Sequence, residues 1–244
     1  MKVWAHRGAS AYAPQNTLEA FRLAAEMHAD GVELDVHLSK DGEVIVCHDE
    51  TIATTSNGTG LICDMTLAEL KTYDFGCKFA GGGFEGKGVR VPTLREVYEL
   101  LAPTGLMVNV ELKTNVYEYE GIEQKCLDLA REFGMSDRIV YSSFHFDSLR
   151  RVLALDSTAR TALLYEGSGF DALKLAKNEG AWALHPKYRC VYEYDVRAYA
   201  ETGVVVNPWT VDDPAEMKKQ MDMGINALIT DNPDLAIQVR EGKL

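Results

Sequence analysis

The stretch from Gly31 to Glu50, GVELDVHLSKDGEVIVCHDE, decides how this chain folds. Apolar residues alternate in it with Glu33, Asp35 and His37, so the three polar side chains share one face of a strand. Asp41-Gly42 is a strong signal for a hairpin turn. The stretch therefore predicts a strand, a tight turn and a returning strand that runs antiparallel to the first.

The returning strand ends at His48, and the turn decides what His48 opposes. A turn centred on Lys40-Asp41 pairs residue 33 with residue 48, whereas a turn centred on Asp41-Gly42 pairs residue 35 with residue 48. Either register places His48 against Glu33 and Asp35, with opposed Cβ atoms ~5 Å apart. Two carboxylates this close repel each other unless a positive group joins them. The hairpin therefore indicates a divalent cation, and the alternative is a pair of solvated acids.

Strands and helices alternate along the rest of the chain. Apolar patterns predict strands at 3–6, 32–38, 106–112, 139–142, 160–164, 181–184, 204–207 and 227–229. Helices lie between them, and the first is predicted at 17–28 with Asn16 as its N-cap. This alternation is typical of a parallel sheet. Eight units in 244 residues favour a closed (β/α)8 TIM barrel, an α/β fold, over an open sheet. We expect one domain spanning residues 1–244.

One segment, at about 49–90, breaks the alternation between the second strand and its helix. It contains TTSNGTG and FAGGGFEGKG, which are rich in glycine and small polar residues. A loop this long in a compact domain is usually functional. Barrel active sites lie where the strands end, so this insertion is expected to form a lid or wall over the mouth. Phe79 and Phe84 could cover the mouth or form a small core of their own.

Polar residues stand at the ends of several predicted strands, and these ends converge in a barrel. Carboxylate oxygens suit Mg²⁺ or Ca²⁺ better than Zn²⁺. Histidines can serve as general acid and base, and cationic side chains can contact an anion. The candidates are Glu33, Asp35 and Glu111 for the metal, His6 and His48 for proton transfer, and Arg7 and Lys113 for the anion. Together they indicate phosphoryl chemistry. Trp209, at another strand end, is expected to form a wall against the substrate.

The composition restricts the partners. The net charge of −12 argues against nucleic acid or an anionic membrane surface, although a bound metal would still attract a small anion. The five cysteines form no CxxC pair, which favours reduced thiols in the cytoplasm. The opening MKVWAHRG reads as a first strand rather than a leader, and no apolar run approaches the ~20 residues of a membrane span. A homo-oligomer is left open.

Seven segments, in order and across nearly the whole chain, resemble the glycerophosphodiester phosphodiesterase family. They are AHRGASAYAPQNTLEAF, GVELDVHLSKDGEVIVCHDETI, TLAEL, VPTLREV, NVELK, SSF and NPWTVDD. The resemblance implies the barrel with its insertion and a metal held by Glu33, Asp35 and Glu111. It also implies catalysis by His6 and His48, with Arg7 and Lys113 near the phosphate. The family reaction splits a glycerophosphodiester into glycerol 3-phosphate and an alcohol such as choline or ethanolamine.

One position departs from the family pattern. Members usually carry Glu-Asn-Thr where this chain has Gln15-Asn16-Thr17. Gln15 keeps the size and hydrogen bonding of glutamate but not its negative charge. If that glutamate reaches the metal, metal affinity is reduced here, and activity is still expected.

Three other functions compete with this interpretation. A lysophospholipase D-like enzyme would need an apolar surface for acyl chains, and the polar insertion argues against it. A phosphate-binding barrel without catalysis would lack a histidine or a ligand, and none is missing. A metal-dependent sugar isomerase would not need His6-Arg7 together with Lys113. The head group, the choice between Mg²⁺ and Ca²⁺ and the identity of the acid histidine stay open, with a slight preference for His48 as the acid.

Overall fold

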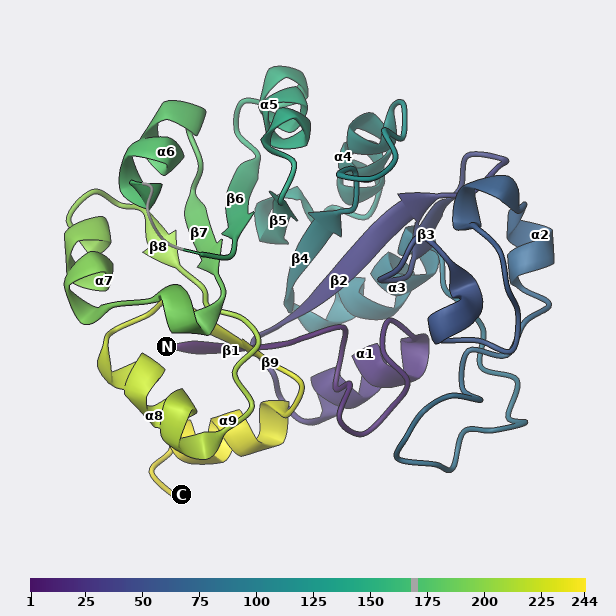
Figure 1. The fold of residues 1–244 in the computed structure, drawn as a ribbon, viewed down its shortest axis with the longest axis horizontal. Coiled ribbons are helices and arrows are strands. Elements are labelled where there is room, and N and C mark those ends of the chain that lie inside the picture. The colour runs from purple at the N-terminus through teal and green to yellow at the C-terminus, as the bar shows by residue number, and fades with distance from the viewer. Residues whose placement is uncertain (168–170) are drawn as a thin grey trace.

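The computed structural model describes residues 1–167 and 171–244. Its sheet follows the order β8-β7-β6-β5-β4-β2-β1-β9, and neighbours along this path are parallel (Figure 1). The strands are β1 (Lys2–Ala5), β2 (Gly31–Leu38), β4 (Met107–Leu112), β5 (Ile139–Ser143), β6 (Arg160–Tyr165), β7 (Ala183–Pro186), β8 (Val205–Val206) and β9 (Ala227–Thr230). The expected (β/α)8 barrel is confirmed.

The barrel closes between β8 and β9 through irregular backbone contacts rather than a regular ladder. The amide of Asn226 donates to the carbonyl of Val206 at 3.0 Å, and the amide of Ile229 donates to the carbonyl of Pro208 at 3.0 Å. The side chain of Asn207 accepts a further bond from the amide of Ala227 at 3.1 Å. These bonds satisfy backbone groups that two open sheet edges would leave unpaired.

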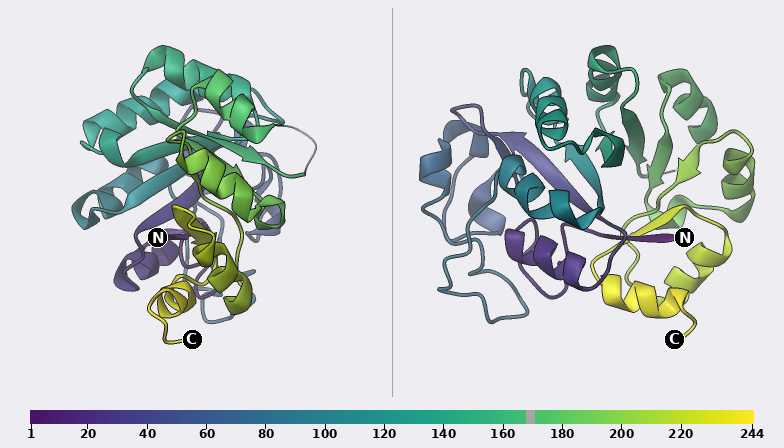
Figure 2. Two further views of the ribbon diagram at one scale, coloured as in Figure 1. Left: turned by 90° about the vertical axis from the view of Figure 1, so that its left-hand side faces the viewer. Right: turned by 180° about the vertical axis from the view of Figure 1, so that it is seen from behind.

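The helices lie outside the ring of strands, as the view from behind also shows (Figure 2). They are α1 (Leu18–Glu26), α3 (Leu94–Leu101), α4 (Ile122–Glu132), α5 (Phe146–Leu155), α6 (Ala172–Glu179), α7 (Glu193–Ala200), α8 (Pro214–Asp222) and α9 (Pro233–Arg240). Their buried apolar faces and the outer face of the sheet form the main core. Within the described residues, no helix has the length and apolar character needed to cross a membrane.

The first helix corrects one prediction. Thr17, not Asn16, is the N-cap of α1, and its hydroxyl accepts a hydrogen bond from the amide of Ala20. Asn16 instead has a left-handed backbone with φ of 57° and is buried. Asparagine tolerates this conformation better than most residues. The side chain of Asn16 is therefore free to point into the barrel mouth.

The β2–β3 hairpin takes a register that lies between the two predicted ones. In β3 (Val44–Val46), Val44 pairs with Leu38 and Val46 pairs with Val36. The turn has three residues rather than two, and it ends at Gly42 with a φ of 81°, which glycine adopts without strain. Cys47 rather than His48 therefore opposes Asp35, so both predicted registers are wrong. His48 follows the end of β3.

The segment between β3 and α3 lies against one side of the barrel, around α2 in Figure 1. It contains the short helices η1 (Ile52–Thr54), η2 (Ile62–Asp64) and α2 (Leu67–Leu70). Its buried side chains form an apolar cluster together with Ile45 of β3: Cys47, Ile52, Ile62, Leu70, Phe75, Val89 and Val91. The composition of this segment suggested a polar loop. In the structure, however, apolar side chains spaced along the segment are buried in this cluster.

Candidate active site

Three buried carboxylates converge at the mouth of the barrel. Glu33 and Asp35 lie on β2, and Glu111 lies on β4, where it pairs directly with Asp35. Parallel partners in register point to the same face of the sheet, so the alternation seen in the sequence brings all three together. One oxygen from each residue lies within 4.8 Å of the others. The predicted ligands are therefore close enough to share one cation.

The electrostatics of this cluster favour a cation. Burial, and then the charges of Asp35 and Glu111, raises the pKa of Glu33 well above its usual range. Burial and Asp35 raise the pKa of Glu111 to about 7. Burial also opposes the charge of Asp35, but Arg7 and Lys113 outweigh it and lower the pKa of that carboxyl group. The Oδ1 atom of Asp35 is buried and has no hydrogen-bond partner. This donor set fits a hard divalent cation.

Arg7 contacts two of the carboxylates through different groups. Its backbone amide donates to Oε2 of Glu33 at 2.9 Å, and its Nε lies 3.5 Å from Oδ2 of Asp35. A left-handed backbone, with φ of 54°, aims the amide at Glu33. Such a conformation costs about 1–3 kcal/mol in a residue that is not glycine, and strained residues cluster at functional sites. The guanidinium also donates to Oε1 of Gln15 at 2.5 Å.

His6 is oriented by a carboxylate that the sequence analysis did not identify. Its Nδ1 lies 2.7 Å from Oδ1 of Asp231, which also accepts a bond from the hydroxyl of Ser10 at 2.8 Å. Because Asp231 is an acceptor, Nδ1 carries the proton when the ring is neutral, and Nε2 is then free to accept one. Nε2 lies 3.9 Å from Oε2 of Glu33 and so faces the carboxylate cluster.

His48 has a matching arrangement. Its Nδ1 lies 2.6 Å from Oδ1 of Asp49, and its Nε2 lies 3.3 Å from Nζ of Lys113. Burial is the first cause that lowers the pKa of His48, and it favours the neutral ring. The buried ring of His37 contacts the carbonyl oxygen of His48 at 3.1 Å and so fixes its backbone. The backbone bond from Cys47 to Asp35 and this contact with His37 together place His48 at the mouth.

Lys113 joins His48 to the carboxylates. Its Nζ lies 3.0 Å from Oε1 of Glu111 and 3.7 Å from Oδ1 of Asp35. Burial opposes its charge, but Glu111 and Asp35 raise its pKa, so Lys113 stays charged. Lys113 and Arg7 therefore both bring a positive charge to the carboxylates, and cationic side chains of this kind bind phosphate groups.

A cavity of about 180 Å³ connects these groups, and we call it the central cavity. It is lined by His6, Arg7, Glu33, His48, Asn109, Glu111, Lys113, Phe144, Leu164, Glu166, Trp209 and Ile229. Trp209 donates its indole N–H to the carbonyl of His185 at 2.7 Å, and its ring meets the edge of Phe144 with centroids 5.7 Å apart. The structure thus brings the predicted site residues together, with Trp209 in one wall.

Residues 6–235 match the model of the "Glycerophosphoryl diester phosphodiesterase family". This protein belongs to that family. It is 40% identical to a glycerophosphodiester phosphodiesterase of Caldanaerobacter subterraneus subsp. tengcongensis, over 98% of both chains. It is 36% identical to a glycerophosphodiester phosphodiesterase of Bacillus altitudinis, again over 98% of both chains.

Solved structures are similar across the whole barrel. A phosphodiesterase from Oleispira antarctica, solved in complex with the product sn-glycerol-3-phosphate, matches with a TM-score of 0.87 and 28% identity. The match covers 99% of this chain and 97% of that one. A structure from Silicibacter pomeroyi matches with a TM-score of 0.91 over 100% and 94% of the two chains, but its 22% identity shows the fold alone.

In this glycerophosphoryl diester phosphodiesterase family member, four residues of the site were not predicted, and one of them is Asp49, which holds His48. Asn16 donates its amide to Oδ2 of Asp35 at 2.8 Å, and Asp231 holds His6. Asn109 pairs with Glu33 in the sheet, and its Oδ1 is buried without a partner at the central cavity. Asp231 directly follows β9, so the strand-end argument used for the other residues could have found it. Asn16 gave no such signal, since an asparagine before a helix usually caps it.

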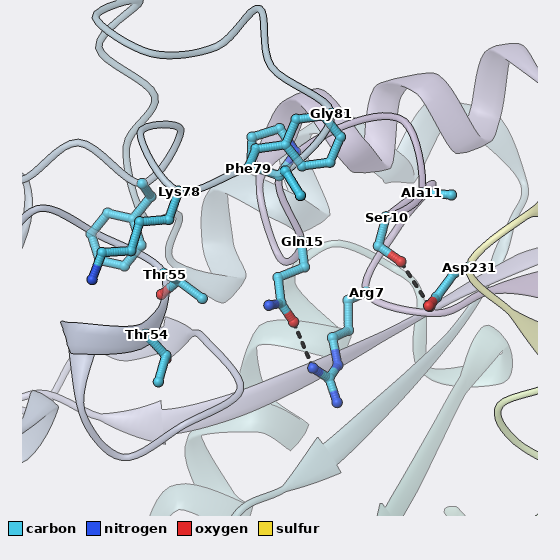
Figure 3. Close-up of a pocket in the computed structure, with 13 residues that line it drawn as sticks. Arg7, Ser10, Ala11, Gln15, Thr54, Thr55, Lys78, Phe79, Gly81 and Asp231 are labelled. Atoms are coloured by element: carbon cyan, nitrogen blue, oxygen red, sulfur yellow. Dashed lines mark hydrogen bonds between the residues drawn. The ribbon is translucent and has the colours of Figure 1, made fainter.

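A second cavity, of about 470 Å³, adjoins the central one, and we call it the outer cavity (Figure 3). It lies between the segment after β1 and the insertion. Its walls are Arg7, Ser10, Ala11, Pro14, Gln15, Thr54, Thr55, Phe75, Lys78, Phe79, Ala80, Gly81 and Asp231. Phe79 lines it, whereas Phe84 packs against the cluster of the insertion and meets the edge of Phe79 at 5.5 Å. Both expectations for this aromatic pair thus hold in part.

Proposed function

We propose that this protein hydrolyses glycerophosphodiesters to glycerol 3-phosphate and an alcohol, with a divalent cation and two histidines. Family membership supports the phosphodiesterase activity. The observation that carries the mechanism is one cavity lined by two buried carboxylates, two cationic side chains and two histidines, with the third carboxylate, Asp35, beside the other two. Each histidine is held by its own aspartate.

Glu33, Asp35 and Glu111 would hold the cation, and their oxygen donors suit Mg²⁺ or Ca²⁺. A cation bound there would stabilise negative charge on the non-bridging oxygens of the phosphate. Arg7 and Lys113 lie beside the same carboxylates and would contact the remaining phosphate oxygens. Side chains fixed before the substrate arrives stabilise developing charge without reorganising.

The histidines would move the two protons that hydrolysis requires. The Nε2 atom of one histidine accepts a proton from the attacking water as the new P–O bond forms. The other, protonated at Nε2, gives a proton to the alcohol oxygen as the old P–O bond breaks. Asp231 and Asp49 stabilise the imidazolium form of their partners in turn. One water is consumed, and the products are a phosphomonoester and an alcohol.

The structure bears differently on the competing functions. The outer cavity combines apolar walls, which include Phe75 and Phe79, with the charged side chains of Arg7, Lys78 and Asp231, and these charged groups suit an acyl chain poorly. A binding protein without catalysis would not need both histidines held by carboxylates beside the phosphate contacts. Hydrolysis of a small, polar diester therefore explains more residues of the site than either competing function does. Trp209 and Phe144 would form the apolar wall against the substrate.

Product analysis tests this function. The protein is incubated with Mg²⁺ or Ca²⁺ and a panel of glycerophosphodiesters, and phosphorus NMR follows the reaction. The proposal expects the diester signal to be replaced by that of glycerol 3-phosphate, with one alcohol released for each phosphate. A lysophospholipid that is cleaved faster than every glycerophosphodiester would favour the lysophospholipase D-like function instead.

A further inference from the structure

The reaction proposed above leaves the outer cavity without a role. Arg7 lines both cavities, so they meet at the side chain expected to contact the phosphate. Asp231 lines the outer cavity and holds His6, which lines the central one. A diester whose phosphate lies at Arg7 can therefore extend one of its two ester arms into the outer cavity.

The walls of the two cavities differ, and this difference indicates which ester arm of the substrate each cavity binds. The central cavity, of about 180 Å³, has strand-end residues and the edge-to-face pair Phe144 and Trp209 in its walls, which give it a small and partly apolar shape. That shape suits the glycerol arm, which all these diesters share. The outer cavity is completed by the insertion through Phe79 and Gly81, and it has more than twice the volume. We propose that the outer cavity binds the leaving alcohol and selects uncharged, hydroxyl-bearing alcohols over alcohols that carry an ammonium group.

Gln15 is the first reason for this selectivity. Its Oε1 accepts a bond from Arg7, and a guanidinium group has only donors, so the amide oxygen must face Arg7. The amide nitrogen is then turned away from Arg7, toward the side of Thr54 and Thr55 in Figure 3. An N–H donor there complements the oxygen of an alcohol hydroxyl. It offers nothing to an ammonium group, which has no lone pair.

The charges on the walls give the second reason. Arg7 and Lys78 are the two cationic side chains among the described residues that line the outer cavity, and the ammonium group of Lys78 donates to the carbonyl oxygen of Ala53. Asp231 is the one carboxylate among the described residues that line it, and it already accepts bonds from Ser10 and His6. An ammonium arm would therefore meet like charges without a free carboxylate. Specificity arises from such unfavourable contacts as well as from favourable ones.

This inference rests on the proposed function, and its test compares two esters of the same glycerophosphate, those of inositol and choline. The value of kcat/KM is measured from the glycerol 3-phosphate released, at one cation concentration, so that any effect on cation binding cancels in the ratio. We expect the wild type to prefer the inositol ester about tenfold. Gln15→Glu should lower the preference about tenfold by adding a carboxylate, and Gln15→Met about threefold by removing one hydrogen bond.

Gln238→Glu, on the exposed face of α9, is the control for the added charge and should leave the ratio unchanged. The inference is wrong if the wild type cleaves both esters equally well or prefers the choline ester. It is equally wrong if neither Gln15 variant changes the ratio, because the alcohol would then lie elsewhere. If neither ester yields glycerol 3-phosphate, the proposed function itself fails, and the assignment of the cavity fails with it.

Discussion

At the scale of residues, the carboxylate cluster needs a further positive charge if all three of its acids are to be ionised beside Arg7 and Lys113. Glu33 and Glu111 both have raised pKa values, in part because they face Asp35. We expect Glu33→Gln, Asp35→Asn and Glu111→Gln each to weaken cation binding more than about tenfold, because each removes a charged oxygen ligand. Calorimetric titration with Mg²⁺ and Ca²⁺ measures this. Glu123→Gln, at another buried carboxylate, should leave the affinity unchanged. Equal affinities in all four variants would contradict the assignment.

The loss of activity on removing each histidine should depend on the leaving group for one histidine and not for the other. A natural alcohol is a poor leaving group and needs a proton, whereas p-nitrophenolate leaves without one. General acid catalysis contributes about 10²–10⁴-fold, so removing the acid should matter little for the p-nitrophenyl ester. We measure kcat/KM for His6→Ala and His48→Ala on glycerophosphocholine and on a glycerophospho-p-nitrophenyl ester. One variant alone should recover much of its loss on the activated ester. If both lose the same factor on both substrates, the roles are not divided.

His185 predicts how stability depends on pH. It is fully buried, Nε2 contacts the amide of Asn207 at 2.9 Å, and burial lowers its pKa from 6.5 to about 3. Below pH 6.5 this histidine is therefore protonated in the unfolded chain but stays neutral in the folded chain. The free energy of unfolding therefore decreases as the pH falls. Between pH 6.5 and 4.5 this group should remove about 2 kcal/mol from the free energy of unfolding.

Urea unfolding at a series of pH values measures this effect. His185→Gln should be less stable than the wild type at neutral pH, but its stability should decrease less on acidification. His28→Asn, at an exposed position, is the control and should keep the wild-type slope. Parallel slopes for the wild type and His185→Gln would show that the buried ring is not the titrating group.

The residues of the site show where sequence reasoning succeeded and where it stopped. Glu33, Asp35 and Glu111 could be grouped because strand alternation and convergent strand ends depend only on local sequence. Asn16 could not be placed, since its left-handed backbone is favoured by contacts with Asp35 that come from another element. His48 was expected directly opposite the carboxylates, but Cys47 takes that place in the pairing, and the contact of His37 with the backbone of His48 holds the next residue at the mouth.

At the scale of elements, the insertion combines a packed base with an open tip. Ile52, Ile62 and Leu70 are fully buried in the base. At the tip, a side chain added at Gly82 or Gly83 would meet no other atom within 4 Å. The base was not visible in the sequence because its apolar residues follow neither a helical nor a strand period. The glycine-rich tip, by contrast, was correctly seen as a distinct feature.

This division predicts two different effects of mutation. Deleting Gly82 and Gly83 should change the ranking of alcohol head groups, because it moves Phe79 and Gly81 at the outer cavity. It should shift the melting temperature little, since shortening a surface loop changes its closure entropy by less than about 1 kcal/mol. Ile62→Ala should instead cost about 2–5 kcal/mol of stability by leaving a cavity. Melting curves and kcat/KM for several esters measure both effects. If the deletion lowers stability sharply and the ranking stays fixed, the tip is structural.

At the scale of the whole molecule, the alternation of strands and helices was enough to predict the barrel, because parallel strands require crossover helices. The seam between β8 and β9 was not predictable, since it relies on side-chain and irregular backbone bonds around Asn207. The single-domain organisation and the cytoplasmic location remain proposals.

The most direct measurement of the central claim is the release of glycerol 3-phosphate with and without the cation. The protein is treated with excess EDTA, its metal content is determined, and kcat/KM on a glycerophosphodiester is measured before and after Mg²⁺ or Ca²⁺ is restored. The account predicts that EDTA abolishes product release, that the cation restores it, and that Glu111→Gln needs more cation than the wild type for the same rate. Full activity in excess EDTA, with no metal in the protein, would contradict it.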